Sequence, residues 1–176
     1  MNGKLILREL QEGDEASFRR AAIELEESDP SWQFAFGWTP KSDFKEYLGL
    51  LENWKKGRDL PEGWVPSHYY VGVVEGEVVG RLSLRTKLND FLARIGGHIG
   101  YAVVPSCRMN GYATGMLNQS LIISRSLGIS KVFITCDVDN LPSRRVIEKC
   151  GGEFEGITNY PELTKQKRLY WINVNE

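Results

Sequence analysis

At 176 residues, the chain is long enough for one domain with its own hydrophobic core and leaves little room for a second. Hydrophobic residues make up 41% of the chain and charged residues 26%, which excludes the disordered and membrane-embedded classes of protein. A formal net charge of -1 removes the broad electrostatic argument for a nucleic-acid partner.

The distribution of apolar and cysteine residues indicates where the chain resides. No apolar run approaches the ~20 residues of a membrane span, and the first ten residues carry Lys4, Arg8 and Glu9, unlike a secretory leader. The three cysteines and two histidines show no zinc-binding spacing. We therefore expect a cytoplasmic protein with reduced thiols, no bound metal and no membrane partner.

The start of the chain predicts a short strand followed by a helix. Leu5–Arg8 is the expected strand, and Glu12-Gly13-Asp14 is a typical opening for the helix. Apolar residues then recur at i, i+3, i+4 and i+7, which places them on one helical face: Phe18, Ala21, Ala22 and Leu25.

A second amphipathic helix is expected to begin near Thr39-Pro40. Threonine is a good N-cap and proline fits the first helical position. The apolar residues that follow again keep helical spacing: Phe44, Tyr47, Leu48 and Leu51.

The connector between these helices, residues 32–38 (WQFAFGW), is unusually aromatic and follows an acidic run at Glu24, Glu26, Glu27 and Asp29. Two interpretations are open. The rings could simply complete the core against the helices. Alternatively, some of them form the wall of a pocket in which the nearby carboxylates attract a cationic amine.

Strands dominate the middle of the chain. Tyr69–Val74 and Glu77–Arg85 flank the turn residues Glu75-Gly76 and are expected to form a hairpin. Gly97–Val104 is the next expected strand, and Pro105 ends it. A helix is then expected to run to Gly128, with an apolar side formed by Ala113, Met116, Leu117 and Leu121.

The last third predicts a buried strand at Lys131–Cys136, then a helix that is capped by Asp139 or Asn140 and stops at residues 151–152. Two closing strands are expected at 153–158 and 168–174. The order of elements predicts a single α/β (α+β) domain over residues 1–176, with a mixed, mostly antiparallel sheet of about seven strands and helices on both faces.

The junction from residue 104 to residue 114, where a strand ends and a helix begins, has the features of an anion site. The first amides of a helix have no partners within the helix, and the helix dipole adds partial positive charge there. Gly111 lets phosphate oxygens approach the backbone, Ala113 allows close packing, and Arg108 adds a positive charge. The junction lacks the P-loop and Gly-x-Gly-x-x-Gly sequences, which excludes these two classes of nucleotide-binding protein.

Two segments together resemble the GNAT superfamily of N-acetyltransferases. Residues 108–113 (RMNGYA) resemble its pyrophosphate signature, Arg/Gln-x-x-Gly-x-Gly/Ala, and residues 140–151 (NLPSRRVIEKCG) resemble its Asn-capped helix ending in Lys-x-Gly. The opening at residues 7–10 is similar to that of many members, so the resemblance covers essentially the whole chain. The pattern is most similar to poorly characterised acetyltransferases near the ribosomal-protein N-terminal acetyltransferases.

The resemblance implies a GNAT-like domain that uses acetyl-CoA, with acceptor-side helices at about 14–56 and an acetyl-CoA-binding core at about 97–152. The backbone of Ala102, Val103 and Val104 would hydrogen-bond the pantetheine arm like an added strand. The pyrophosphate would lie on seven consecutive residues: Arg108, Met109, Asn110, Gly111, Tyr112, Ala113 and Thr114.

The resemblance also implies a role for the asparagine before the last helix. Asn140 would meet the pantetheine arm from the neighbouring strand end, and Ser143 and Arg145 are lesser candidates for contact with the cofactor. Plain N-capping is the alternative role of Asn140, and both roles can hold together.

In this family an amine attacks the thioester directly. The backbone N–H of Val103 is the expected donor to the oxyanion. His98 is the candidate base or water relay, and a hydrogen-bonded structural histidine is the alternative. Many members carry a tyrosine acid seven residues after the asparagine, but here the position is Ile147, so solvent could protonate the thiolate. Tyr101 and Tyr112 are weaker candidates for the acid.

The expected function is transfer of an acetyl group to a primary amine of a small molecule or peptide through a ternary complex. The alternative is a coenzyme A-binding module that has lost catalysis, which Ile147 favours. A covalent acetyl-enzyme at Cys107 is disfavoured because no Cys/His pair is visible. Edge strands are compatible with a homodimer.

Overall fold

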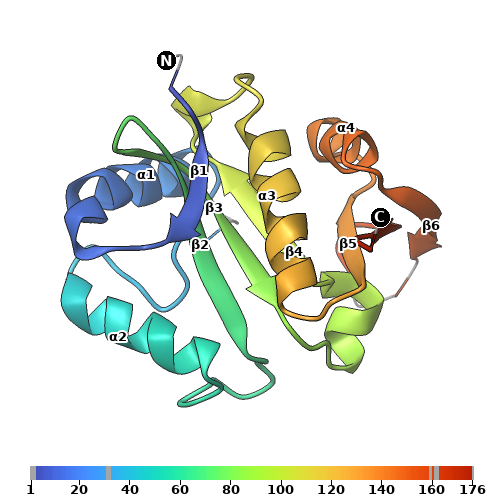
Figure 1. Cartoon of the computed structure of the whole chain (residues 1–176), viewed down its shortest axis with the longest axis horizontal. Helices are drawn as coiled ribbons and strands as arrows, with labels where there is room; N and C mark the ends of the chain where they lie inside the picture. Colours follow the sequence, from blue (N-terminus) through green and yellow to red (C-terminus); the bar gives the residue numbers. More distant parts are fainter. Residues whose placement is uncertain (1–2, 31–32, 159, 161–162, 176) are drawn as a thin grey trace.

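The computed structural model describes residues 3–30, 33–158, 160 and 163–175. Within these residues, seven strands and four α-helices form an α/β domain, which confirms the predicted fold class (Figure 1). In the same ranges, every helix is too short or too polar to cross a membrane. The helices are α1 (Glu15–Ser28), α2 (Phe44–Lys55), α3 (Tyr112–Ser126) and α4 (Leu141–Lys149).

The strands form two antiparallel sheets, with the orders β1-β2-β3-β4 and β5-β7-β6. The expected strands lie within two residues of the observed bounds, but the sheet is divided rather than continuous. The bounds are β1 (Ile6–Glu9), β2 (Ser67–Val74), β3 (Glu77–Arg85), β4 (Ile99–Val103), β5 (Lys131–Asp137), β6 (Glu153–Thr158) and β7 (Lys167–Asn173).

Helices cover both faces of the four-stranded sheet. Alternate residues of β2 and β3 point to opposite sides, and apolar residues on each side pack against a different set of helices. On one side, Val71 and Val79 belong to the core shared with α1 and α2. On the other side, Leu82 belongs to the core that contains Met116 of α3. The alternation of apolar and polar residues in β3 therefore does not mark an exposed face, and Arg81 is only 1% exposed.

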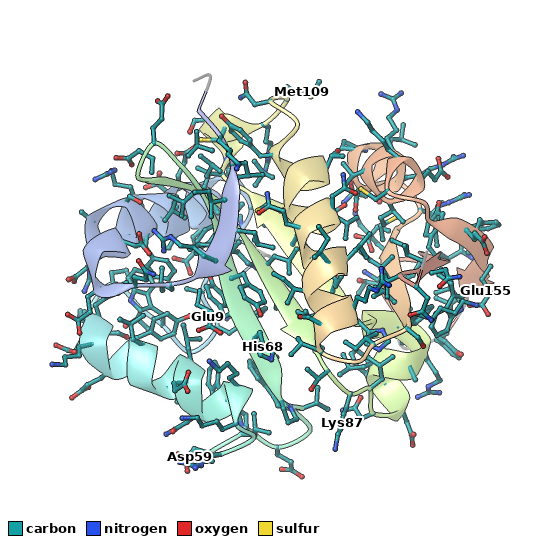
Figure 2. All side chains as sticks on the ribbon, in the orientation of Figure 1. Glu9, Asp59, His68, Lys87, Met109 and Glu155 are labelled. Atoms are coloured by element: carbon teal, nitrogen blue, oxygen red, sulfur yellow. The ribbon has the colours of Figure 1, made fainter. Side chains whose placement is uncertain are left out.

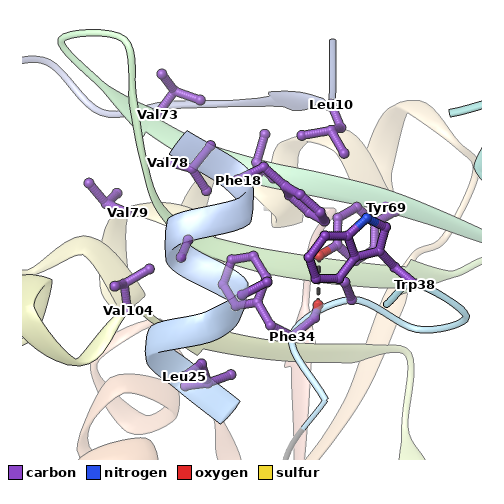
Figure 3. Close-up of a cluster of buried hydrophobic side chains, with 14 of the residues drawn as sticks. Leu10, Phe18, Leu25, Phe34, Trp38, Tyr69, Val73, Val78, Val79 and Val104 are labelled. Atoms are coloured by element: carbon purple, nitrogen blue, oxygen red, sulfur yellow. Dashed lines mark hydrogen bonds between the residues drawn. The ribbon is translucent and has the colours of Figure 1, made fainter. Parts of the chain in front are cut away.

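Phe18 of α1 lies at the centre of the core beneath α1 and α2 (Figure 3). Its ring centre is 5.8 Å from that of Phe34 and 5.4 Å from that of Trp38. Phe34 and Trp38 are both buried, so these two rings of the aromatic connector complete the core, as the first interpretation predicted. Trp32 of the same connector lies outside the described residues.

The predicted start of the second helix at Thr39-Pro40 is wrong. The N–H of Ser42 donates to the carbonyl of Thr39, so these residues form a turn. The N-cap is Asp43, whose Oδ1 accepts the N–H of Glu46 at 2.9 Å, and α2 begins one residue later. An aspartate is as good an N-cap as threonine, and the turn before it satisfies the preceding backbone.

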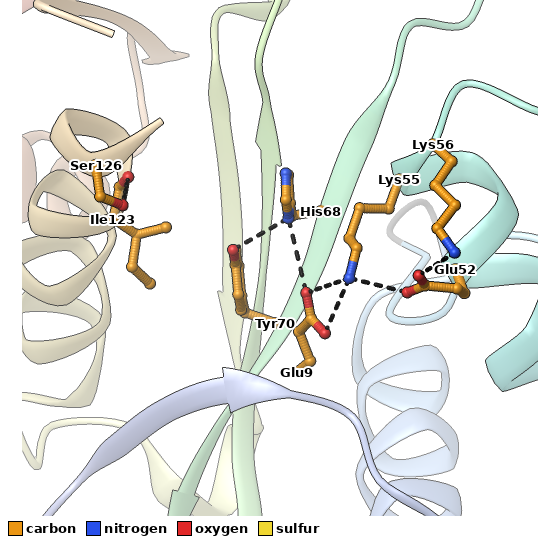
Figure 4. A network of polar contacts seen from close by, with 8 residues as sticks. All are labelled: Glu9, Glu52, Lys55, Lys56, His68, Tyr70, Ile123 and Ser126. Atoms are coloured by element: carbon orange, nitrogen blue, oxygen red, sulfur yellow. Dashed lines mark hydrogen bonds and ion pairs between the residues drawn. The ribbon is translucent and has the colours of Figure 1, made fainter. Parts of the chain in front are cut away.

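A polar network ties the end of α2 to the first two strands (Figure 4). Lys55 Nζ lies 3.1 Å from Glu9 Oε1 and 2.9 Å from Glu52 Oε2. Beside them, the hydroxyl of Tyr70 lies 3.2 Å from Nδ1 of His68. Because ion pairs at the surface contribute little to stability, the network orients α2 on the sheet more than it stabilises the fold.

Candidate active site

The two sheets meet at one point and then separate. The N–H of His98 donates to the carbonyl of Phe133 at 2.7 Å, and the N–H of Phe133 donates to Nδ1 of His98 at 2.9 Å. Beyond this point, no ladder joins β4 to β5 in the described part of the chain. The separation opens one edge of β4, and α3 packs at the junction between the two sheets (Figure 1).

The hydrogen bonds of β4 show which backbone groups face this opening. The N–H of Val104 donates to Val79, and its carbonyl accepts the N–H of Cys107. Because backbone groups alternate along an antiparallel strand, Ala102 faces β3 as Val104 does, whereas Val103 faces the open edge. Val103 is therefore the member of the predicted trio whose N–H and carbonyl are both turned to the open edge, whereas the N–H groups of Ala102 and Val104 face β3.

The loop after β4 brings the predicted phosphate-binding residues together. Met109 has φ = 63° and Gly111 has φ = 78°, which turns the chain sharply into α3. Asn110 donates from Nδ2 to the carbonyls of Cys107 and Arg108 at 3.1 and 3.0 Å, so the side chain secures the loop through carbonyl groups. Met109 is 99% exposed at the tip of the loop (Figure 2).

The first turn of α3 presents free amides. The first helical hydrogen bond runs from Gly115 N–H to the carbonyl of Gly111 at 3.0 Å, and no side chain caps the helix. The N–H groups of Tyr112, Ala113 and Thr114 therefore have no partner within the helix, at its positive end. A Cβ added to Gly111 would meet no atom within 4 Å, so the space in front of these amides is open. The arrangement suits a phosphate.

Asn140 stands on the other side of the opening, where β5 leads into α4. Its Oδ1 accepts the N–H of Ser143 at 3.0 Å, which makes it the N-cap of α4, whereas the carboxylate of Asp139 pairs with Lys165. Arg145 is exposed on α4, and within the described ranges its side chain makes no ion pair.

Tyr101 and Ser143 form a contact that the sequence did not indicate. The Tyr101 hydroxyl on β4 lies 2.8 Å from Oγ of Ser143 on α4, so the pair joins the two walls of the opening. Burial raises the pKa of Tyr101 well above its usual value, so the phenol keeps its proton at neutral pH. Only the three-dimensional structure brings these residues together, because 42 positions separate them.

Ile147, at the position where many related enzymes carry a tyrosine, is fully buried among the aliphatic residues around α3. A Cβ added to Gly152 would lie 2.5 Å from its Cγ2 atom, so the surroundings of Ile147 are tightly packed. Tyr112, the other candidate acid, is buried in the core beneath α1 and α2. Neither side chain stands on the open edge of β4.

The geometry of His98 supports the structural alternative. Nδ1 accepts the N–H of Phe133, so the neutral ring carries its proton on Nε2 and has no free lone pair for a second proton. Burial lowers the pKa of His98, and the positive charge of Arg85 lowers it further. The ring therefore stays neutral at physiological pH and links β4 to β5.

The three cysteines are buried free thiols. Burial raises the pKa of Cys150 to about 11, so this thiol is not a nucleophile at neutral pH. Oγ of Ser106 lies 3.8 Å from Sγ of Cys107 and is no base for it. Within the described residues, no group of three or more His, Cys, Asp or Glu side chains is placed to hold a metal.

A pocket of about 200 Å³ lies on the face of β3 that is opposite α3. Ser83 and Arg85 contribute polar groups from β3, and Arg85 is the charged residue of the described lining. The expected carboxylates do not line it: Glu24, for example, accepts the N–H and hydroxyl of Ser106 at 2.6 and 3.0 Å. The apolar walls are formed mainly by Phe36, Leu51, Trp54, Trp64, Phe91 and Leu92. Phe36 of the aromatic connector thus forms part of a pocket wall, as the second interpretation of the connector predicted for some of its rings.

Comparison with known proteins identifies the fold. The chain is similar to RimJ of Mycobacterium smegmatis, solved in complex with CoA-disulfide, at 21% identity over 97% of this chain and 82% of that one, with a TM-score of 0.72. It is also similar to the ribosomal-protein-S5-alanine acetyltransferase of Vibrio fischeri, at 16% identity over 98% and 94% of the two chains, with a TM-score of 0.68.

A third solved structure, yncA of Salmonella typhimurium with its cofactor acetyl-CoA, is 13% identical over 98% of this chain and 95% of that one, with a TM-score of 0.63. A sequence search finds no match among curated proteins. The acetyltransferase (GNAT) domain family matches residues 4–153, which include the loop after β4, the open edge of β4 and α4. The chain therefore belongs to the GNAT family of acetyltransferases.

Proposed function

We propose that the chain transfers an acetyl group from acetyl-CoA to a primary amine of a small molecule or peptide, by direct attack within a ternary complex. The observation that carries the proposal is the start of α3, where Gly111 turns the chain and three amides without helical partners lie beside the open edge of β4. Two of the similar structures hold CoA-disulfide and acetyl-CoA, which supports the same use of this site.

In this proposal the pyrophosphate lies on the loop and first turn, residues 108–114, and Val103 pairs with the pantetheine arm along β4. Asn140 meets the arm from the opposite wall, with Ser143 and Arg145 beside it. Arg108 donates from Nε to the carbonyl of Val103 at 3.4 Å, so it must release this contact as the arm docks. Acetyl-CoA supplies the thioester carbonyl, and the chain supplies position and hydrogen bonds.

Two groups of the chain serve the reaction itself. The N–H of Val103, turned to the open edge, donates to the carbonyl oxygen as negative charge develops there. The paired hydroxyls of Tyr101 and Ser143 replace the usual tyrosine as proton donor to the sulfur, because they join the walls of the opening and Tyr101 stays protonated. Solvent remains the alternative donor.

The function is tested by calorimetry with acetyl-CoA and by thiol release with a panel of amines. We expect binding of acetyl-CoA and thiol release that depends on the acceptor. Binding without turnover on any amine would favour the alternative, an inactive coenzyme A-binding module. The buried Ile147, at the position of the usual tyrosine acid, is the feature that favours this alternative. No binding of either form of the coenzyme would reject the proposed site.

His98→Asn tests whether a protein base is used. The asparagine oxygen can accept the N–H of Phe133 but does not titrate, so we expect the variant to keep the pH–rate profile of wild type. Because the folded-state pKa of His98 is lowered, its stabilising effect is present above the unfolded value of ~6.5 and is lost as pH falls through the folded value. The melting temperature of wild type should therefore drop more steeply on acidification than that of the variant.

The control for this experiment is His68→Asn, since His68 is also partly buried with a lowered pKa but lies outside the opening. Both histidine variants should then share the wild-type dependence of rate on pH. If the rise in rate near pH ~6.5 disappeared in His98→Asn and persisted in the control, His98 would be the base, as the sequence allowed.

A further inference from the structure

Two guanidinium groups and a hydroxyl surround Gly100, next to the part of the pocket that Ser83 and Arg85 line. Arg81, Ser83 and Arg85 share one face of β3, and Ser83 is paired with Gly100 of β4. A methyl group placed on Gly100 would lie 3.4 Å from Ser83 Oγ and 4.0 Å from Nη1 of both Arg81 and Arg85. The Ser83 hydroxyl donates to the carbonyl of Gly100 at 3.3 Å and accepts Nη1 of Arg81 at 3.5 Å, so a ligand must take over the contact with Gly100. The absence of a side chain at Gly100 leaves room for a small group beside it.

The contacts of Arg85 leave its charge without a counter-ion. Nη1 donates to the carbonyls of Gly96 and Gly97 at 3.5 and 3.2 Å, and in the described part of the chain no carboxylate lies within ion-pair distance. Carbonyl contacts fix the position of the guanidinium but do not neutralise it. A cation that is mostly withdrawn from water and lines a pocket is a ready partner for an anion.

Arg81 lies deeper and strengthens the same field. It donates to the carbonyl of Gln33 at 2.8 Å and stacks over Phe36 at 4.7 Å. Burial lowers the pKa of Arg81 to about 10, with Arg85 contributing through like-charge repulsion, and both remain charged at neutral pH. Arg85, which lines the pocket, is therefore the guanidinium placed to receive an anion there.

We propose that Arg85 and Ser83 bind a carboxylate carried by the acceptor close to its amine, while the aromatic walls take an apolar group. The acceptor class is then an amino-acid-like amine, either a free amino acid or a peptide whose first residue is acidic. This inference rests on the proposed acetyltransferase function and names the acceptor class for it.

The position of the pocket suits this role. Ser83 and Gly100 are neighbours across strands that lie about 4.8 Å apart, and the far edge of β4 is the open edge. A carboxylate held at Ser83 and Arg85 therefore places an amine a few bonds away near the thioester. The volume of about 200 Å³ is below the ~300–1,000 Å³ of pockets for drug-sized ligands, so it admits one small group such as a single residue.

The positive field also aids the chemistry. The α-amino group of a peptide has a pKa of ~7.7–8.0, and its protonated form must lose a proton before it attacks. Nearby cations disfavour the ammonium form and so lower the pKa of the bound amine. The arginines thus attract the ligand through its carboxylate and also favour the neutral, reactive form of its amine.

The test measures ligand binding through the fluorescence of Trp54 and Trp64, which line the pocket, with coenzyme A present. The matched ligands are phenylalanine, phenylalaninamide and phenethylamine, which share the ring and amine but differ in the carboxylate. Glu-Phe-amide and Gln-Phe-amide test a carboxylate on a peptide side chain. We expect at least one carboxylate ligand to bind roughly tenfold or more tighter than its uncharged match.

Arg85→Gln should remove this preference, while the exposed Arg125→Gln on α3 should retain it. A melting curve checks that Arg85→Gln folds. If Arg85→Gln does not fold, Arg85→Lys replaces it in the test, and this variant should retain part of the preference because it keeps the charge. Equal affinity of matched ligands in wild type, no binding of any ligand, or a preference that survives Arg85→Gln would each overturn the inference. Acetylation of amines without a carboxylate would then leave the proposed function intact, whereas loss of acetyl-CoA binding would count against the function itself.

Discussion

Replacing Gly111 with valine is expected to abolish acetyl-CoA binding. Gly111 has φ = 78°, and a residue with a Cβ pays roughly 1–2 kcal/mol for this left-handed conformation. The valine side chain would also enter the open space in front of the first amides of α3, where the phosphates are expected. Loss of two charge-assisted hydrogen bonds would weaken binding by roughly 100-fold or more, which calorimetry can measure.

Gly128→Val is the matched control for this prediction. Gly128 follows the other end of α3, has φ = 80°, and a Cβ there would also meet no atom within 4 Å. Both variants should lose similar folding stability, because the backbone cost is the same. Only Gly111→Val should lose the cofactor, and equal acetyl-CoA affinities in the two variants would place the pyrophosphate elsewhere.

Phe18→Ala is expected to give the largest loss of stability, about 3–5 kcal/mol in the free energy of unfolding. The ring is fully buried between α1, α2 and β2. Besides the rings of Phe34 and Trp38, its ring centre lies 5.4 Å from that of Phe44 and 5.8 Å from that of Tyr47. Its removal takes away apolar burial and leaves a cavity that rigid aromatic neighbours fill poorly.

Urea denaturation of Phe18→Ala and of Phe154→Ala measures this loss against a matched control. Phe154 lies on β6, is 50% exposed and contacts the ring of Tyr170 at 5.6 Å. Its truncation should therefore cost much less. A loss below about 1 kcal/mol for Phe18→Ala would mean that the aromatic core is not packed as described.

The local elements were predictable because their signals are local. The hairpin of β2 and β3 follows from the turn at Glu75-Gly76, where the observed φ values are 51° and 84°. The missed start of α2 shows the limit: Thr39 and Asp43 are both acceptable N-caps, and the turn that Ser42 closes decides between them. Competing caps of similar propensity are separated only by what surrounds them.

The sequence by itself determined the loop proposed to bind phosphate, because residues 108–114 form one continuous turn into a helix, and neighbouring residues set its backbone conformation and its free amides. Tertiary structure alone decided the rest of the site. It divided the sheet at His98, brought Tyr101 to Ser143, and placed the half-buried Arg85 beside a pocket with no carboxylate in its described lining. These features depend on packing between segments far apart in the chain, and alternation along a strand does not reveal whether its polar face meets water or a second layer.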